Sequence, residues 1–193
     1  MTDKPGMRSR IQAARTAMPN DEREAARLAI RDHVLSYCAS ELASDAWVAG
    51  YQPTRTEPGS VELLAALADR GHRVLVPLTL PDRDLDWTAW DEPSSRSAQP
   101  AAQPLGMAAI ARVALILVPA YAVDRSGHRL GRGGGSYDRA LARVRPGTPV
   151  AALLFAEELV ETVPVDEWDL PVTAAVTPAG WIQLTPTGLR NSG

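Results

Sequence analysis

Apolar residues in this chain follow two different spacings, which predict an alternation of strands and helices. Short apolar runs predict buried strands, and the alternation of apolar and polar residues from Asp84 to Trp90 predicts a half-buried strand. Apolar residues three or four positions apart predict amphipathic helices. The predicted strands cover residues 47–49, 73–78, 84–90, 114–118, 149–155 and, as the last strand, 172–177; the predicted helices cover residues 21–38, 60–71 and 137–144. This repeated order favours an α/β domain with a mainly parallel sheet.

Three segments depart from the alternation. Pro5 and Gly6 disfavour a helix near the N-terminus, where a frayed and solvated tail is one interpretation. The stretch from Glu92 to Gly106 is rich in Pro, Ser, Ala and Gln and predicts a loop. Residues 185–193 are expected to form a disordered tail, so that residues 1–184 make up a single domain.

Composition and charge narrow the classes of function. The formal net charge is -3 and the pI is about 5.6, which gives a general attraction to nucleic acid no electrostatic basis. Residues 1–20 lack the apolar stretch of a signal peptide, and the longest apolar run is shorter than the roughly 18 residues of a membrane span. The single cysteine, Cys38, excludes an intramolecular disulfide. We therefore expect a cytoplasmic monomer that binds neither nucleic acid nor membrane.

The stretch from Leu117 to Arg139 contains most of the candidate functional residues. It runs from a predicted strand through a long polar loop and several glycines into a helix that begins near Tyr137. Backbone N–H groups and the guanidinium groups of Arg129 and Arg132 together predict an anion site, and polyphosphate is the favoured ligand. Asp138 would repel a phosphate unless a cation such as Mg²⁺ lies between them. The pattern therefore indicates a metal–nucleotide site.

Two common phosphate-binding motifs do not fit these glycines. A Walker A loop requires a lysine after the glycines, and none is present. A dinucleotide-binding fingerprint would place glycine at Ser136 and would follow its strand directly. A flexible surface loop with solvated arginines remains the simpler structural alternative.

The stretch resembles the signature of the 5-formyltetrahydrofolate cyclo-ligase family, also called 5,10-methenyltetrahydrofolate synthetases, which reads VPxxxFDxxGxRLGxGxGYYD. The corresponding residues here are Val118, Pro119, Val123, Asp124, Gly127 and the run from Arg129 to Asp138. The resemblance covers most of the chain and is most specific at residues 117–139 and 163–169. It implies a three-layer fold, a mainly parallel sheet flanked by helices, as in the ribose-5-phosphate isomerase and coenzyme A transferase group.

The resemblance also implies a reaction and its participants. The expected activity is the ATP-dependent, Mg²⁺-assisted cyclisation of 5-formyltetrahydrofolate to 5,10-methenyltetrahydrofolate, with release of ADP and phosphate. Arg129 and Arg132 are the expected catalytic residues, Asp138 and Asp169 the expected Mg²⁺ ligands, and Glu57 the residue that holds the pterin ring. Folate contacts are also implied for Arg132, Ser136 and Tyr137, and ATP contacts for Lys4, Arg8, Arg129, Leu130, Gly131, Arg132, Gly133, Gly134, Gly135, Ser136 and Tyr137.

Several departures from the family pattern keep alternatives open. Val123 replaces a Phe, Ser136 replaces a Tyr, and Glu158 takes the place of a Gln, which motivates a non-catalytic homologue that binds nucleotide or folate. A phosphosugar- or CoA-processing enzyme of the same fold is a further alternative. A Gly-Ile-x-Glu-Pro element of the relatives is not found near the loop 92–106. Glu57 has a structural alternative too, in which it complements a helix dipole.

Overall fold

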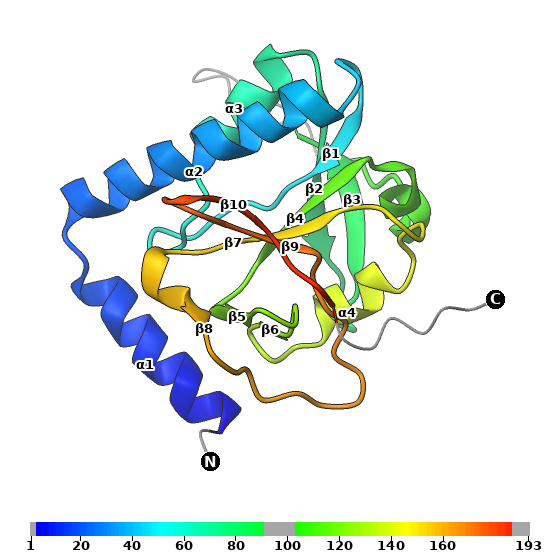
Figure 1. The fold of residues 1–193 in the computed structure, drawn as a ribbon. Helices are drawn as coiled ribbons and strands as arrows, with labels where there is room; N and C mark the ends of the chain where they lie inside the picture. The colour runs from blue at the N-terminus through cyan, green and yellow to red at the C-terminus, as the bar shows by residue number, and fades with distance from the viewer. Residues whose placement is uncertain (1–2, 91–102, 187–193) are drawn as a thin grey trace.

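A seven-stranded sheet forms the centre of the structure, a computed structural model that describes residues 3–90 and 103–186 (Figure 1). The strand order is β10-β9-β7-β4-β1-β2-β3. The five inner strands run parallel, and β3 and β10 are antiparallel at the two edges, which confirms the mainly parallel sheet. The strands are β1 (Trp47–Ala49), β2 (Arg73–Thr79), β3 (Leu85–Ala89), β4 (Leu115–Pro119), β7 (Val150–Leu153), β9 (Ala174–Thr177) and β10 (Gly180–Gln183).

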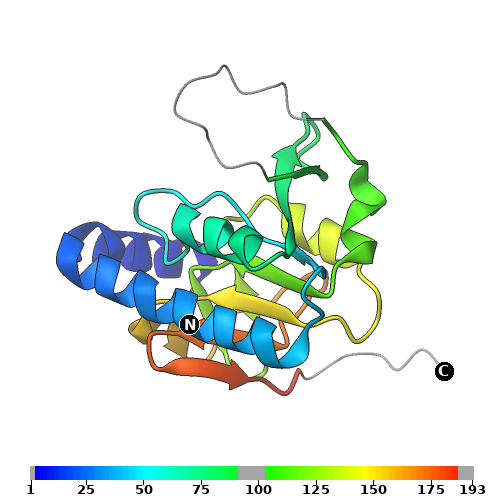
Figure 2. The same ribbon diagram turned by 90° about the horizontal axis from the view of Figure 1, so that it is seen from above.

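Helices cover both faces of this sheet, so the predicted three layers are present. On one face, α2 (Asn20–Glu41) and α3 (Val61–Asp69) lie side by side (Figure 2). Ser60 caps α3 through a hydrogen bond from the Leu63 N–H. The short 3₁₀ helix η1 (Met107–Arg112) and α4 (Ser136–Leu141) pack on the other face.

Strand β4 shows why the inner strands have continuous apolar sequences. Leu115 and Leu117 belong to the core beneath α2 and α3, and Ile116 and Val118 belong to the core on the opposite face. Successive side chains of a strand point to opposite faces, so a strand covered on both sides must be apolar at every position. Each of these fully buried side chains stabilises the fold by about 1.5 to 3 kcal/mol.

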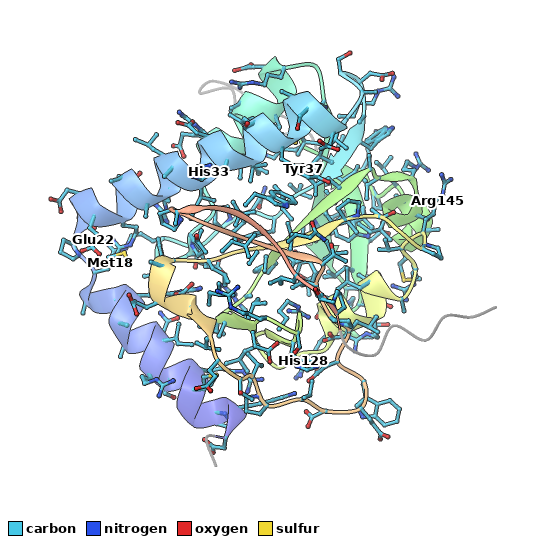
Figure 3. The ribbon with its side chains drawn as sticks, in the orientation of Figure 1. Met18, Glu22, His33, Tyr37, His128 and Arg145 are labelled. Carbon is cyan, nitrogen blue, oxygen red and sulfur yellow. The ribbon has the colours of Figure 1, made fainter. Side chains whose placement is uncertain are left out.

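The edge strand β10 shows that one prediction was wrong, because the last strand is not the one at 172–177. The chain turns back after Thr177 and pairs β10 with β9. Helix α2 holds this hairpin: the rings of Tyr37 and Trp181 stack at 3.8 Å between centroids, and His33 Nε2 lies 3.2 Å from the Pro178 carbonyl oxygen. Figure 3 shows His33 and Tyr37 on α2.

The N-terminal helix α1 (Lys4–Ala17) packs on a second, three-stranded sheet, β6-β5-β8 (Figure 1). Its predicted disruption at Pro5 and Gly6 was wrong. Asp3 accepts a hydrogen bond from the Gly6 N–H as the helix N-cap. Pro5 lies in the first turn, where the N–H group that proline lacks would have no partner in the helix. The small sheet consists of β5 (Ala122–Asp124), β6 (Arg129–Leu130) and β8 (Leu159–Val160).

The segment between β4 and the glycines is therefore not the long polar loop that the sequence predicts. Strands β5 and β6 form a hairpin, and the buried Asp124 organises its turn. Asp124 Oδ1 accepts hydrogen bonds from the N–H groups of Ser126 and His128, and Oδ2 accepts one from the Val163 N–H. This hairpin delivers Arg129 and the glycines to the edge of the main sheet.

The remaining differences concern element ends and segments outside the described residues. Helix α4 ends at Leu141, three residues before the predicted end at residue 144. Residues 92–102 of the predicted loop and residues 187–193 of the predicted tail lie outside the described residues. Within residues 3–90 and 103–186, no helix combines the length and apolar character that crossing a membrane requires.

Candidate active site

A cleft of about 1150 Å³ opens at the carboxyl ends of β1, β2 and β4. Ligands of open α/β sheets bind at this edge, because loops leaving neighbouring parallel strands meet there. Every site residue predicted from the sequence lines the cleft: Lys4, Arg8, Glu57, Arg129, Leu130, Gly131, Arg132, Gly133, Gly134, Gly135, Ser136, Tyr137, Asp138 and Asp169. These residues come from α1, the loop after β1, β6, the glycine segment (residues 131–137), α4 and the loop before β9.

The glycine segment leaves a row of backbone donors without protein acceptors. Among the described residues, no protein oxygen accepts a hydrogen bond from the N–H groups of residues 132–137. Gly133 and Gly135 have φ values of +93° and +66°, a region that residues with side chains rarely adopt. A Cβ atom at Gly131 would lie 2.5 Å from Arg129 Nη1. The segment thus needs glycine both for its conformation and for the close approach of Arg129.

Helix α4, which follows these glycines, has only six residues. A short helix aligns few peptide dipoles, so its N-terminus is a weaker anion site than the sequence argument assumes. The arginine side chains and the free N–H groups therefore contribute most of the attraction for an anion.

The two predicted catalytic arginines lie in different environments. The side chain of Arg129 is only 4% exposed, and its Nη2 donates to Asp138 Oδ1 at 3.0 Å. The side chain of Arg132 is 59% exposed, and its Nη2 donates to Glu57 Oε1 at 2.9 Å. Arg129 is therefore a buried charge beneath the glycine segment, and Arg132 is an exposed charge at the cleft surface.

Helix α1 contributes two cations to the same cleft. Arg8 Nε donates to the Gly131 carbonyl oxygen at 2.8 Å. Lys4 Nζ forms ion pairs with Asp166, at 2.8 Å, and with Asp169. Partial burial lowers the pKa of Lys4, but hydrogen bonds to the two aspartates and their charges outweigh it and leave the pKa raised. Lys4 is accordingly a permanent positive charge in the cleft.

The carboxylates of Asp138 and Asp169 each keep one oxygen free of protein partners in the described part of the chain. Asp138 uses Oδ1 for Arg129 and for the Leu170 N–H, and Asp169 uses Oδ2 for Lys4 and the Asp166 N–H. No group of three or more His, Cys, Asp or Glu side chains among the described residues could hold a metal by itself. Mg²⁺ is commonly held by one or two carboxylates together with substrate phosphates, so this donor set fits a metal that arrives with a nucleotide.

Glu57 also lines the cleft, and its side chain is only 7% exposed. Its Oε2 accepts hydrogen bonds from the N–H of Thr54 at 2.7 Å and from the Thr54 hydroxyl at 3.1 Å. One carboxylate oxygen therefore holds the loop between Thr54 and Glu57, and the other contacts Arg132. The N-terminus of α3 is capped by Ser60 and not by Glu57. These contacts do not support the alternative in which Glu57 complements the dipole of that helix.

Tyr137 adds a polar group beside Glu57. Its hydroxyl is buried and has no hydrogen-bond partner among the described residues. Burial raises the pKa of Tyr137, so the phenol stays protonated and can act as a hydrogen-bond donor. The Arg129 guanidinium carbon lies 5.8 Å from the centre of its ring. A ligand can supply the missing partner, because buried polar groups are rarely left unsatisfied.

Two residues that depart from the family pattern do not line the cleft. Val123 is fully buried in the core beneath η1 and α4. Glu158, at the end of the short 3₁₀ helix η2 (Ala156–Glu158), forms a buried ion pair with Arg15 at 2.6 Å. Ser136 is the departure that does line the cleft. The added charge of Glu158 is therefore neutralised inside the protein.

Several cleft residues were missed by sequence reasoning. Tyr51 and Thr54 follow β1 directly, a position that the strand-end rule could have identified. Trp168 is 74% exposed and lies beside Asp169, in the segment 163–169 where the resemblance gave a role only to the aspartate. Arg139 also lines the cleft, and its Nη2 donates to the Arg83 carbonyl oxygen at 2.6 Å.

Taken together, four basic side chains, a row of free N–H groups and two carboxylates with free oxygens are the groups that bind a metal–polyphosphate in an α/β protein. The family model of the 5-formyltetrahydrofolate cyclo-ligase family matches residues 1–178, and this chain belongs to that family. The resemblance stated from the glycine signature is thereby confirmed.

Individual relatives agree with this assignment. The chain is 33% identical over 185 residues to the 5-formyltetrahydrofolate cyclo-ligase of Mycolicibacterium smegmatis, which covers 91% of this chain and 93% of the relative. The 5,10-methenyltetrahydrofolate synthetase structures from Mycoplasma pneumoniae and Aquifex aeolicus have TM-scores of 0.76 and 0.71, at 18% and 24% identity. They cover 92% and 98% of this chain and 99% of their own chains, and they show that the fold is shared.

Proposed function

We propose that this chain catalyses the ATP-dependent cyclisation of 5-formyltetrahydrofolate to 5,10-methenyltetrahydrofolate, with release of ADP and phosphate. The observation that carries the proposal is the convergence, in a member of this family, of phosphate-binding cations and a buried carboxylate in one cleft. We call the part of the cleft lined by these cations the nucleotide side, and the part lined by Glu57 the folate side. The enzyme is a ligase that forms a carbon–nitrogen bond.

The nucleotide side binds the triphosphate through charge and backbone donors. Lys4 and Arg8 reach it from α1, and Arg129 and Arg132 reach it from the two sides of Gly131. The N–H groups of residues 132–137 donate to phosphate oxygens, since they have no acceptor in the described protein. Hydrogen bonds between charged groups are roughly twice as strong as neutral ones, which favours this cleft for a polyanion.

Asp138 and Asp169 are the residues that would hold Mg²⁺ together with the phosphates, through the oxygens that their protein partners leave free. The ion supplies neutralisation of the charge that accumulates on the phosphates during transfer. Arg129 and Lys4, which already contact these two carboxylates, lie close enough to the same phosphates to share that task.

The folate side orients the formyl group. Glu57 accepts hydrogen bonds from N–H donors on the pterin edge, and the Tyr137 hydroxyl finds its missing partner on the same ligand. Ser136 and Arg132 line the same cleft and contact folate as well as nucleotide in this proposal. The protein thereby places the formyl oxygen against the γ-phosphate, and such positioning supplies much of the barrier reduction in phosphoryl transfer.

The chemistry proceeds in two displacements. The formyl oxygen attacks the γ-phosphorus, the bond from phosphorus to the bridging oxygen breaks, and ADP leaves. The N10 lone pair then attacks the activated formyl carbon, the carbon–oxygen bond to phosphate breaks, and N10 loses its proton. Arg129 and Arg132 stabilise the charge on the transferred phosphoryl group. No covalent intermediate with the protein is required.

We place the enzyme in the cytoplasm, because a single buried cysteine suits a compartment without disulfide formation, and we propose that it acts as a monomer. The central test is the appearance of methenyltetrahydrofolate absorbance after mixing the protein with ATP, Mg²⁺ and 5-formyltetrahydrofolate. Turnover that depends on all three components supports the proposal. Binding of both substrates without turnover would instead identify a non-catalytic homologue, and binding of neither would point to a different enzyme of the same fold.

A further inference from the structure

The ion pair between Glu57 and Arg132 joins the two sides of the cleft. Glu57 is the proposed pterin ligand, and Arg132 is a proposed phosphate ligand 75 positions further along the chain. One Glu57 oxygen is already used by the N–H and hydroxyl of Thr54. The Arg132 guanidinium therefore occupies the oxygen that faces the cleft. While this ion pair is intact, a pterin N–H must compete with Arg132 for Oε1, because Oε2 already accepts two hydrogen bonds from Thr54.

The pair is built so that it can open. The Glu57 side chain is buried and held by Thr54, whereas the Arg132 side chain is largely exposed and lies between Gly131 and Gly133. Glycines on both sides leave the backbone of Arg132 few steric restrictions. Because the Arg132 side chain is 59% exposed, a more highly charged anion in the cleft can compete with the carboxylate for the guanidinium. The triphosphate of ATP is such an anion.

We infer that Arg132 couples the two substrate sites: it occupies the Glu57 carboxylate until nucleotide phosphates draw it away, and ATP thereby prepares the folate site. This inference rests on the proposed function. Arg132 is then a positioning residue for folate in addition to a phosphate ligand. The reciprocal effect follows from linkage, so folate must strengthen nucleotide binding by the same factor. We expect a coupling of about fivefold, at the low end of the range for coupled sites.

Calorimetric titration of 5-formyltetrahydrofolate into the whole protein tests the inference. The titration is done with and without saturating Mg²⁺ and β,γ-methylene-ATP, an analogue that cannot transfer its γ-phosphate. The wild-type protein should bind folate about fivefold more tightly when the nucleotide analogue is present. Folate affinity that is independent of the analogue would overturn the inference and leave the proposed function intact, whereas failure to bind either ligand would overturn both.

The variant Arg132→Ala separates this coupling from direct contact between the two ligands. It removes the competitor for Glu57, so nucleotide-free folate binding should be at least as tight as in the wild type and should gain no more than about twofold from the analogue. A role of Arg132 as a phosphate ligand alone predicts that the wild-type coupling persists, and that result would overturn the inference. Because the side chain is exposed, the variant should fold, which thermal unfolding verifies.

Arg139→Ala is the matched control. Arg139 is another exposed arginine that lines the cleft, but its hydrogen bonds go to the carbonyl oxygens of Asp82 and Arg83. Its removal changes the net charge by the same amount and leaves the Glu57–Arg132 pair in place. The roughly fivefold coupling should persist in this variant. Its loss here as well would show that overall cleft charge produces the effect, which would also overturn the assignment to Arg132.

Discussion

The replacement of Asp138 by Asn separates the structural and the metal-binding roles of this carboxylate. Asp138 Oδ1 accepts hydrogen bonds from Arg129 Nη2 at 3.0 Å and from the Leu170 N–H at 3.2 Å. An Asn side chain can keep an oxygen in this place, so both hydrogen bonds persist without the negative charge. The loss of charge assistance should reduce the free energy of unfolding by about 1 to 2 kcal/mol.

For a chain of this length, such a loss lowers the melting temperature by about 2 to 8 °C. Asp138→Ala should cost more, about 3 kcal/mol, because it leaves the buried Arg129 guanidinium without its counter-charge. The side chain of Asp138 is itself 20% exposed, which keeps this cost near the lower end for buried ion pairs. The order of stability should therefore be wild type, Asn variant, Ala variant.

The metal-binding role predicts a much larger effect on activity than on stability. In Asp138→Asn, the Mg²⁺ concentration for half-maximal methenyltetrahydrofolate formation should rise about 10- to 100-fold. Loss of a residue that only hydrogen-bonds to a metal ligand has an effect of about this size, and loss of a ligand charge should have at least the same effect. The control is Glu167→Gln, which neutralises another acid that lines the cleft. It should leave the Mg²⁺ dependence unchanged. A wild-type Mg²⁺ dependence in a destabilised Asp138→Asn variant would refute the metal assignment and leave Asp138 a purely structural residue.

Four further substitutions test other parts of the structure. Glu57→Gln should raise the KM for folate about 10-fold or more and leave ATP binding nearly unchanged, because the amide turns an N–H donor toward the N–H donors of the pterin. Steady-state kinetics with each substrate varied measures both effects, and an unchanged KM for folate would contradict the prediction. Gly133→Ala and Gly147→Ala both place a Cβ at a positive φ and should each cost about 1 kcal/mol or more, but only the first should weaken nucleotide binding in calorimetry. The Arg143 guanidinium lowers the pKa of Asp84 to about 2, so the contribution of this ion pair to the free energy of unfolding should be present above pH 4 and disappear as the pH falls toward 2. Urea unfolding of the wild type and Asp84→Asn measures this contribution, and a difference in unfolding free energy that is equal at all pH values would contradict the prediction.

Local sequence patterns determined the mainly parallel main sheet and the position of the glycine segment after β6. Strands that are covered on both faces must be apolar at every position, and this requirement is visible in any single strand such as β4. The glycines near Arg129 and Arg132 could also be interpreted from the sequence, because a backbone that approaches a side chain or a phosphate has no room for a Cβ atom. Both constraints act within a few residues, so the sequence alone carries them.

Only the tertiary structure decided which charges meet in the cleft. Lys4 pairs with Asp169, 165 positions away, and Arg132 pairs with Glu57 across the cleft. The same holds for Glu158, whose charge looked like a change in the site and is instead neutralised by Arg15 inside the protein. Ion pairs depend on distance and burial in space, and separation along the chain contains no information about either. The sequence therefore predicted residues that line the cleft, and the fold determined their partners.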